Sequence, residues 1–205
     1  MNGSHFSALL SSPFVLTAIA SATLGFSSPA LALSGFVAPF APSDFTLSNT
    51  PSGDGTIDTT DAATGTVILT GSNDGSISSS STTWVLTNPT TQEFTITFDW
   101  SFAGDDYTHT PSEGDRAGYL LNGTPFYLAT KNGDASGPQI LNLAVGQTFG
   151  FIVDTADNTG NAGVFTVSNF NATATPVPFE SDALPVVGSL VLFGVGVWVK
   201  RRMNG

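Results

Sequence analysis

The feature that most constrains the fold is a strict alternation of apolar and polar residues near the middle of the chain. Between positions 93 and 100, every second side chain is large and apolar: Phe94, Ile96, Phe98 and Trp100. Successive side chains of a β-strand point to opposite faces of a sheet, so these four share one face. Such a face is stable only when a second layer covers it, which predicts a sheet packed against another sheet.

Other short apolar and polar runs, bounded by Gly, Asn, Asp, Pro and Ser, predict further strands. We expect them over 66–70, 83–87, 116–122, 125–129, 139–144, 148–154 and 164–172. The third and fourth of these flank Gly123 and predict a hairpin. With about ten short strands and no convincing amphipathic helix, the sequence predicts an all-β fold: a two-sheet antiparallel sandwich or jelly roll.

Charge and cysteine content exclude several classes of protein. The chain of 205 residues has no cysteine and therefore no disulfide scaffold. All 16 acidic residues lie between Asp44 and Asp182, where the only basic residues are Arg116 and Lys131. This acidic region would repel phosphate backbones, so we expect no nucleic-acid partner. The acidic excess either keeps the domain soluble, which is the commoner explanation, or holds divalent cations.

The N-terminal region has the pattern of a secretory signal. Residues 13–26 are apolar and small, and Ala30-Leu31-Ala32 matches the small-x-small pattern of a signal peptidase site. We therefore predict a signal peptide over 1–32, cleaved after Ala32 by signal peptidase. The first ten residues contain no Lys or Arg, so the α-amino group and His5 supply the positive charge of this region.

The C-terminal region has the pattern of a membrane anchor. Residues 183–199 carry no charge, and about 17 residues is the lower limit for a helix that crosses the hydrocarbon core. Trp198 stands where an interfacial aromatic residue is expected, and Lys200, Arg201 and Arg202 follow it. The positive-inside rule then predicts a transmembrane helix over 183–199, a basic cytoplasmic tail over 200–205, and a body outside the cytoplasm.

Pro178, Phe179 and Glu180 precede this apolar segment and its basic end. The arrangement resembles the PEP-CTERM protein-sorting signal, in the Pro-Phe-Glu variant of cyanobacterial type. The resemblance implies that the membrane and an exosortase-type sorting enzyme are partners, and that the catalytic cysteine belongs to that enzyme. The expected organisation is a linker over 33–43, a β-sandwich domain over 44–172, and a second linker with the sorting motif over 173–182.

Two acidic loops, 103–115 and 154–161, connect expected strands and can meet at one end of a sandwich. Loops of Asp, Asn and Gly supply the oxygen ligands that calcium prefers. The passenger domain also weakly resembles CUB-like sandwiches, with Asp115 before Tyr119 and Asp157 before residues 163–165. This resemblance implies a calcium site; the candidate ligands are Asp106, Asp115, Asp154 and Asp157. Solvated acids and Asx-turns are the alternative interpretation of the same loops.

Few residues point to catalysis. After the signal peptide the only histidine is His109, and no Gly-x-Ser-x-Gly elbow occurs. A glycosidase pair can be drawn from Asp99, Asp106, Glu113 and Asp154, but nothing in the sequence selects two of them. We therefore expect a protein that is not an enzyme.

Aromatic side chains are the last group of candidates, because they can stack on sugar rings. The available residues are Trp84, Trp100, Tyr107, Tyr119 and Tyr127. Trp100 and Tyr119 have the strand phase of core residues, so Tyr107, in the acidic loop, is the better ligand candidate.

Together these features predict an exported, non-catalytic β-sandwich protein of the cell envelope or extracellular matrix. It would be anchored at the membrane or released after exosortase-type processing. The alternative is a calcium-dependent carbohydrate-binding or adhesive module that takes an extracellular polysaccharide, and a less favoured alternative is a polysaccharide-cleaving enzyme.

Overall fold

The alternating segment forms the long strand β6 (Phe94–Asp105), with Phe94, Ile96, Phe98 and Phe102 buried and Trp100 half-buried on one face. The computed structural model describes residues 30–105, 114–130 and 135–176. Within them lie eleven strands and two short 3-10 turns, Pro42–Asp44 and Ala62–Thr64. The other strands are β1 (Ala32–Ser34), β2 (Phe45–Thr50), β3 (Thr56–Asp58), β4 (Val67–Thr70), β5 (Ser80–Leu86), β7 (Arg116–Leu121), β8 (Thr124–Ala129), β9 (Ala135–Leu143), β10 (Phe149–Thr155) and β11 (Asn161–Ala174).

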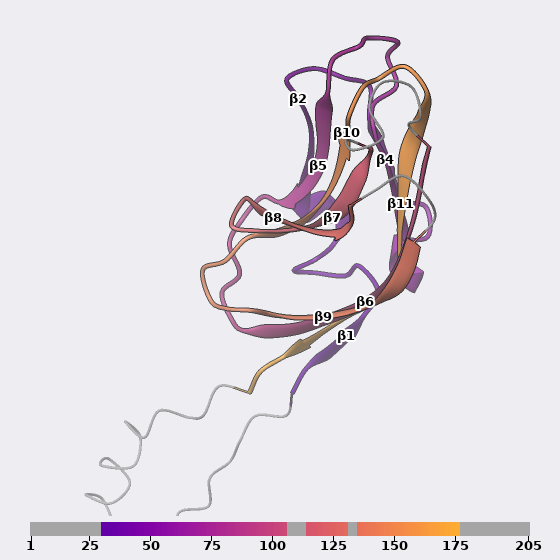
Figure 1. The fold of residues 1–205 in the computed structure, drawn as a ribbon. Helices are drawn as coiled ribbons and strands as arrows, with labels where there is room; N and C mark the ends of the chain where they lie inside the picture. Colours follow the sequence, from indigo (N-terminus) through magenta and orange to yellow (C-terminus); the bar gives the residue numbers. More distant parts are fainter. Residues whose placement is uncertain (1–29, 106–113, 131–134, 177–205) are drawn as a thin grey trace, which may run out of the picture. The chain divides into compact units, whose positions relative to one another are not determined.

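The strands form two antiparallel sheets that pack as a sandwich (Figure 1). The six-stranded sheet has the order β3-β4-β11-β6-β9, and β1 also pairs with β11. The five-stranded sheet has the order β2-β5-β10-β7-β8. The predicted all-β, two-sheet antiparallel sandwich is therefore confirmed, and every segment predicted as a strand contains one.

Phenylalanine dominates the space between the sheets. Phe98 of β6 meets Phe151 of β10 across the core, with ring centroids 5.5 Å apart and planes at 86°. Phe165 of β11 approaches Phe151 to 6.2 Å. Edge-to-face and tilted pairs of this kind add about 1 kcal/mol each beyond the burial of their area. The aromatic residues thus join the two sheets directly.

The N-terminal part of the described chain belongs to the sandwich rather than to a linker. In the segment 33–43, where we expected a linker, Leu33 and Ser34 lie in β1 and pair with β11. Phe36 and Phe40 are 2% and 0% exposed. Phe36 stacks on Phe170 with ring centroids 4.1 Å apart. It also lies 5.6 Å from Trp84 of the opposite sheet.

The two ends of the described domain lie side by side. Ala32 pairs with Thr173, so the first and last strands meet at the C-terminal end of β11. The loop from β10 to β11 lies at the opposite end of β11 (Figure 1). Thr173 and Ala174, expected in the second linker, are the last residues of β11.

Several predictions concern residues outside the described ranges. They are the sorting motif Pro178, Phe179 and Glu180, the span at 183–199, the tail at 200–205 and most of the signal peptide. In the part of the chain that the structure does describe, no helix has the length and apolar character needed to cross a membrane.

Candidate binding cleft

A cleft of about 620 Å³ lies at one end of the five-stranded sheet, where β2 and β10 end and β5 and β7 begin. Hydroxyl groups dominate its wall: Thr50, Ser79, Ser80, Ser81, Thr130 and Thr155. Arg116, Asp154 and the phenol ring of Tyr127 complete its polar lining. The volume falls within the range of about 300–1,000 Å³ typical of small-ligand sites.

Strand register brings the charged residues of the cleft together. Asp154 of β10 pairs with Ser81 of β5 on one side and with Arg116 of β7 on the other. Residues directly opposite in antiparallel strands project from the same face of the sheet, so these three side chains are neighbours. Their neighbours along each strand, such as Val153 and Ala117, point into the core instead.

The register of the β7–β8 hairpin places Tyr127 beside them. Gly118 lies opposite Tyr127, in the same unbroken register as the pairs nearer the turn, and the register shifts only beyond this pair, at Ala117. The two strands approach closely here: a Cβ atom on Gly118 would lie 2.1 Å from the carbonyl oxygen of Phe126. Any residue other than glycine at position 118 would displace β8. The Tyr127 phenol would move with that strand.

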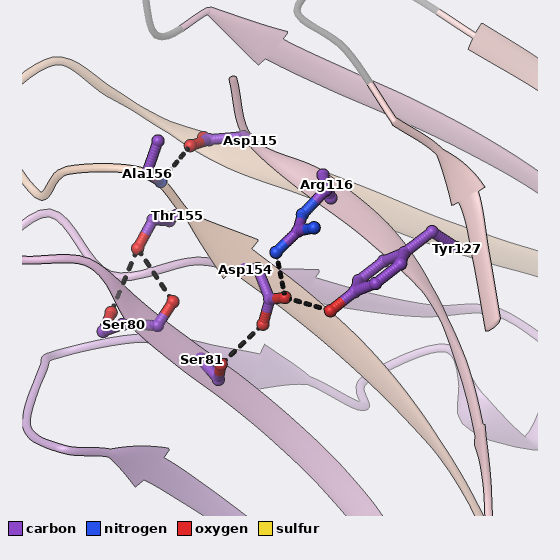
Figure 2. Close-up of polar contacts among 8 residues, drawn as sticks. All are labelled: Ser80, Ser81, Asp115, Arg116, Tyr127, Asp154, Thr155 and Ala156. Atoms are coloured by element: carbon purple, nitrogen blue, oxygen red, sulfur yellow. Dashed lines mark hydrogen bonds and ion pairs between the residues drawn. The ribbon is translucent and has the colours of Figure 1, made fainter. Parts of the chain in front are cut away.

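Asp154 lies at the centre of the polar contacts in the cleft, as Figure 2 shows. Its Oδ2 accepts a hydrogen bond from Arg116 Nη2 at 3.2 Å and another from the Tyr127 hydroxyl. Its Oδ1 accepts a hydrogen bond from Ser81 Oγ at 2.5 Å. One carboxylate therefore connects side chains from three other strands.

Tyr127 is held at both its ring and its hydroxyl. The guanidinium carbon of Arg116 lies 4.4 Å from the ring centroid, which is a cation–π contact. Partial burial, together with the hydrogen bond to Asp154 and the negative charge of that residue, raises the pKa of Tyr127 to about 12, and the Arg116 charge opposes this rise. The phenol is therefore a protonated donor at neutral pH.

Beneath the cleft, a buried hydroxyl and amide network ties the surrounding loops together. Asn158 is 2% exposed, and its Oδ1 accepts hydrogen bonds from Thr155 Oγ1 at 2.7 Å and Ser80 Oγ at 3.1 Å. Its amide donates to Ser76 Oγ at 3.2 Å. This network joins the β4–β5 loop to the β10–β11 loop, so the floor of the cleft is preorganised.

Three of the four acidic residues proposed as calcium ligands lie in the described segments, and each accepts hydrogen bonds from protein donors. Asp154 contacts Arg116, Tyr127 and Ser81, as described above. Asp115 is 1% exposed, and its Oδ1 accepts a hydrogen bond from the backbone N–H of Ala156 at 3.1 Å. Asp157 Oδ1 accepts hydrogen bonds from the backbone N–H and the hydroxyl of Thr159, at 2.9 and 2.8 Å, which is an Asx-turn.

Residues 30–105, 114–130 and 135–176 contain no group of three Asp, Glu or His side chains arranged for a metal ion. Asp106 lies outside these ranges, as do Tyr107, His109 and Glu113. The four-residue calcium site therefore stays a prediction.

The aromatic candidates separate into core and cleft residues. Trp84 is 2% exposed and stacks on Phe45 at 4.1 Å, while half-buried Trp100 packs against Phe165. Tyr119 stacks on Phe126 with centroids 5.2 Å apart. Among the described candidates, Tyr127 alone lines the cleft. One sequence feature does point to the cleft: Arg116 is an isolated base in an acidic region.

Comparisons with known proteins show similarity of fold at low identity. The chain matches no protein-family model, and no curated protein matches it in sequence. One similar structure is a family 61 carbohydrate-binding module in complex with β-1,4-galactotriose (TM-score 0.37, 10% identity, 69% of this chain and 99% of that chain). Another is the family 11 carbohydrate-binding module of the cellulosomal cellulase Lic26A-Cel5E of Clostridium thermocellum (TM-score 0.34, 11% identity, 64% and 88%).

A third similar structure is the enzymatically active domain of tailspike protein 4 of bacteriophage CBA120 (TM-score 0.31, 14% identity). It aligns over 65% of this chain but only 20% of its own length. At these scores no family assignment follows.

Proposed function

We propose that the sandwich is a non-catalytic binding module whose cleft takes a polysaccharide. The observation that carries the proposal is the arrangement of Arg116, Asp154 and Tyr127 in a cleft walled by hydroxyl groups. Binding sites for polar ligands combine a few fixed donors and acceptors with an aromatic surface, and this cleft has both. Because Arg116 and Tyr127 are already held by Asp154, little side-chain entropy is lost when a ligand binds.

The cleft favours binding over cleavage of a glycan. Glycoside hydrolysis ordinarily uses two carboxyl groups on either side of the scissile bond. Among the described residues that line the cleft, Asp154 is the only acid. Its carboxylate accepts hydrogen bonds from three side chains, which suits a structural role in the site better than proton transfer.

A binding assay with matched variants tests this function. We would measure retention of the protein on immobilised polysaccharides by affinity electrophoresis, followed by calorimetry with soluble oligosaccharides. Tyr127→Ala and Arg116→Ala should each weaken binding about tenfold or more, because the first removes the aromatic surface of the cleft and the second removes its guanidinium donors. Retention that is the same in both variants as in the wild type would disprove a role for this cleft.

A second polar hollow supplies the control. It has a volume of about 410 Å³, lies on the six-stranded sheet and is lined by Ser101 and Thr166 among others. Ser101 is exposed and pairs with Thr166 across β6 and β11. Ser101→Ala should leave binding unchanged.

We also propose that the chain is exported and processed at both ends. The support is the sequence: a signal-like region over 1–32, the motif Pro178-Phe179-Glu180, and an apolar segment with a basic end. The first and last described strands pair at the end of the sandwich opposite to the cleft loops, so a tether at either terminus would leave the cleft accessible.

The mass of the mature protein recovered from cells tests the export proposal. We expect ends near Leu33 and near Pro178. An intact C-terminus would indicate a plain membrane anchor, and an intact N-terminus on a cytosolic protein would exclude export.

A further inference from the structure

The charges in the cleft cancel within the protein itself. Arg116 is the only Lys or Arg among residues 30–105, 114–130 and 135–176, and Asp154 neutralises it at 3.2 Å. Since Arg116 is 47% exposed and the side chain of Asp154 only 13%, the guanidinium reaches solvent above its partner. A guanidinium has five N–H donors, so its pairing with Asp154 leaves donors for the hydroxyl groups of a ligand.

Among the described residues that line the cleft, Arg116 is the only cation, and it is already paired with Asp154. The whole chain carries a formal charge of −11. Uronate or sulfate groups would have to compete with Asp154 for Arg116 while approaching a protein of the same sign. That competition costs a charge-assisted hydrogen bond that already exists.

A positively charged ligand is disfavoured for a complementary reason. The Asp154 carboxylate accepts hydrogen bonds from Ser81, Arg116 and Tyr127, which use most of its acceptor positions, and the charge of Arg116 neutralises its own. Ser79 and Thr130, which are exposed at the wall, offer hydroxyl groups that donate and accept equally. The hydrogen-bond donors and acceptors that remain in the cleft are therefore suited to uncharged hydroxyl groups of a ligand.

We infer that the ligand of the cleft is an uncharged polysaccharide, and that the Arg116–Asp154 pair excludes acidic glycans. This inference rests on the proposed binding function and adds the class of ligand to it. Asp154 acts here as a positioning residue, because it orients Arg116 and Tyr127 and cancels the charge that would otherwise attract anions.

The test compares neutral and acidic polymers in the same assay. The neutral probes are a β-glucan and a β-galactan, and the acidic probes are polygalacturonate and a sulfated galactan. Wild-type protein should bind at least one neutral polymer, with an affinity that changes less than about twofold between 50 and 500 mM NaCl because no ion pair with the ligand is screened. It should not bind the acidic polymers at either salt concentration.

The variant Asp154→Asn provides a second test. The quantity measured is its affinity for acidic polymers, which should not change if Asp154 only supported the fold. The amide keeps the shape of the side chain but removes its charge, so Arg116 becomes an uncompensated cation. We expect this variant to gain affinity for acidic polymers by about tenfold in 50 mM NaCl and to lose the gain in 500 mM NaCl. Thermal melting would establish that the variant is folded, and Asp154→Ser would replace it if it is not.

The outcomes distinguish the two proposals. Cleft-dependent binding of an acidic polymer by the wild type would overturn the inference and leave the binding function intact. An Asp154→Asn variant that remains folded and gains nothing would also overturn the inference. If no polymer bound in a manner sensitive to Tyr127→Ala and Arg116→Ala, the binding function itself would be disproved.

Discussion

Tyr127 shows how the cleft controls the state of a single side chain. Its hydroxyl donates to Asp154, its ring lies against Arg116, and its pKa is raised to about 12. Ionisation would place a phenolate next to a carboxylate, so the same contacts that position the ring also keep it protonated. Burial also raises the pKa of Tyr119, on the core side of the same sheet.

This pKa gives stability a defined pH dependence at the alkaline end. Because the folded-state pKa of Tyr127 lies above the unfolded value near 10, the folded protein binds this proton more tightly. The stabilisation is complete below pH 10 and is lost as the pH rises from about 10 to 12. We expect the free energy of unfolding in urea to fall by about 1 kcal/mol over this window from Tyr127, discounted for its partial exposure.

Tyr127→Phe is the matched variant for this measurement, because it keeps the ring and removes the ionisable group. The variant should retain only the smaller fall that comes from Tyr119. Equal pH dependence in the wild type and the variant would show that the contact with Asp154 does not stabilise the protonated phenol.

Asn158 is the residue on which the rigidity of the cleft floor depends. Its side chain is buried and bonded to Ser76, Ser80 and Thr155. Asn158→Ala should lower the free energy of unfolding by about 2–3 kcal/mol, since it leaves buried hydroxyl groups without their partner. Asn73→Ala, at an exposed position of the β4–β5 loop, should change it by less than about 0.5 kcal/mol. Similar losses in the two variants would contradict this account.

At the scale of elements, the short strand β1 and the segment after it close one side of the sandwich. Gly35 follows β1 with a φ of +78°, and its N–H donates to the carbonyl of Phe170 at 2.9 Å. A Cβ atom at this position would lie 2.3 Å from the carbonyl oxygen of Ala63. The turn at Gly35 directs Phe36 into the core, so a side chain here would disturb the aromatic contacts between the two sheets.

Gly35→Ala should therefore lower the free energy of unfolding by about 3 kcal/mol or more, because the cost of the left-handed conformation and the cost of the steric clash add together. Gly75→Ala provides the control. Gly75 has a similar φ of +83°, but a Cβ atom there meets nothing within 4 Å. Gly75→Ala should lower the free energy of unfolding by only about 1 kcal/mol, the cost of the left-handed backbone conformation alone. Urea unfolding of the two variants would measure the difference, and equal losses would refute the packing role of the Gly35 turn.

At the scale of the whole molecule, the sandwich separates its cleft from its ends. The cleft lies where β5 and β7 begin and β10 ends, and β1 pairs with the far end of β11. The proposed binding site and the first and last described strands therefore lie at opposite ends of the described domain.

Calcium binding is also tested on the whole protein. The described carboxylates Asp115, Asp154 and Asp157 already accept hydrogen bonds from protein donors. We therefore expect 1 mM CaCl₂ to leave the melting midpoint within about 1 °C of its value in 1 mM MgCl₂. A rise selective for calcium would show that a metal binds the native state, and its loss in Asp106→Asn would assign the site to the acidic loop.

The sequence by itself determined the class of the fold and eight of the eleven described strands. Alternation is a local property of the chain, so residues 93–100 and the other alternating runs predict strands without knowledge of their partners. It did not reveal β1, β2 or β3, because β1 and β3 have only three residues each and β2 has a single buried one, Phe45. It also missed the buried Phe36 and Phe40, because Gly and Pro surround this aromatic pair.

Only the tertiary structure decided where the cleft lies. Ser81 and Asp154 are 73 positions apart in sequence, and they meet because β5 and β10 pair in one particular register. A shift of one residue would turn Asp154 into the core and Val153 into the cleft. The β7–β8 hairpin, which the sequence does predict, carries Tyr127 to the same place, because Gly118 of β7 lies opposite it. The pairing of β10 with β5 and β7 joins strands that are distant in sequence and depends on how all the strands pack together, so no local pattern in the chain encodes it.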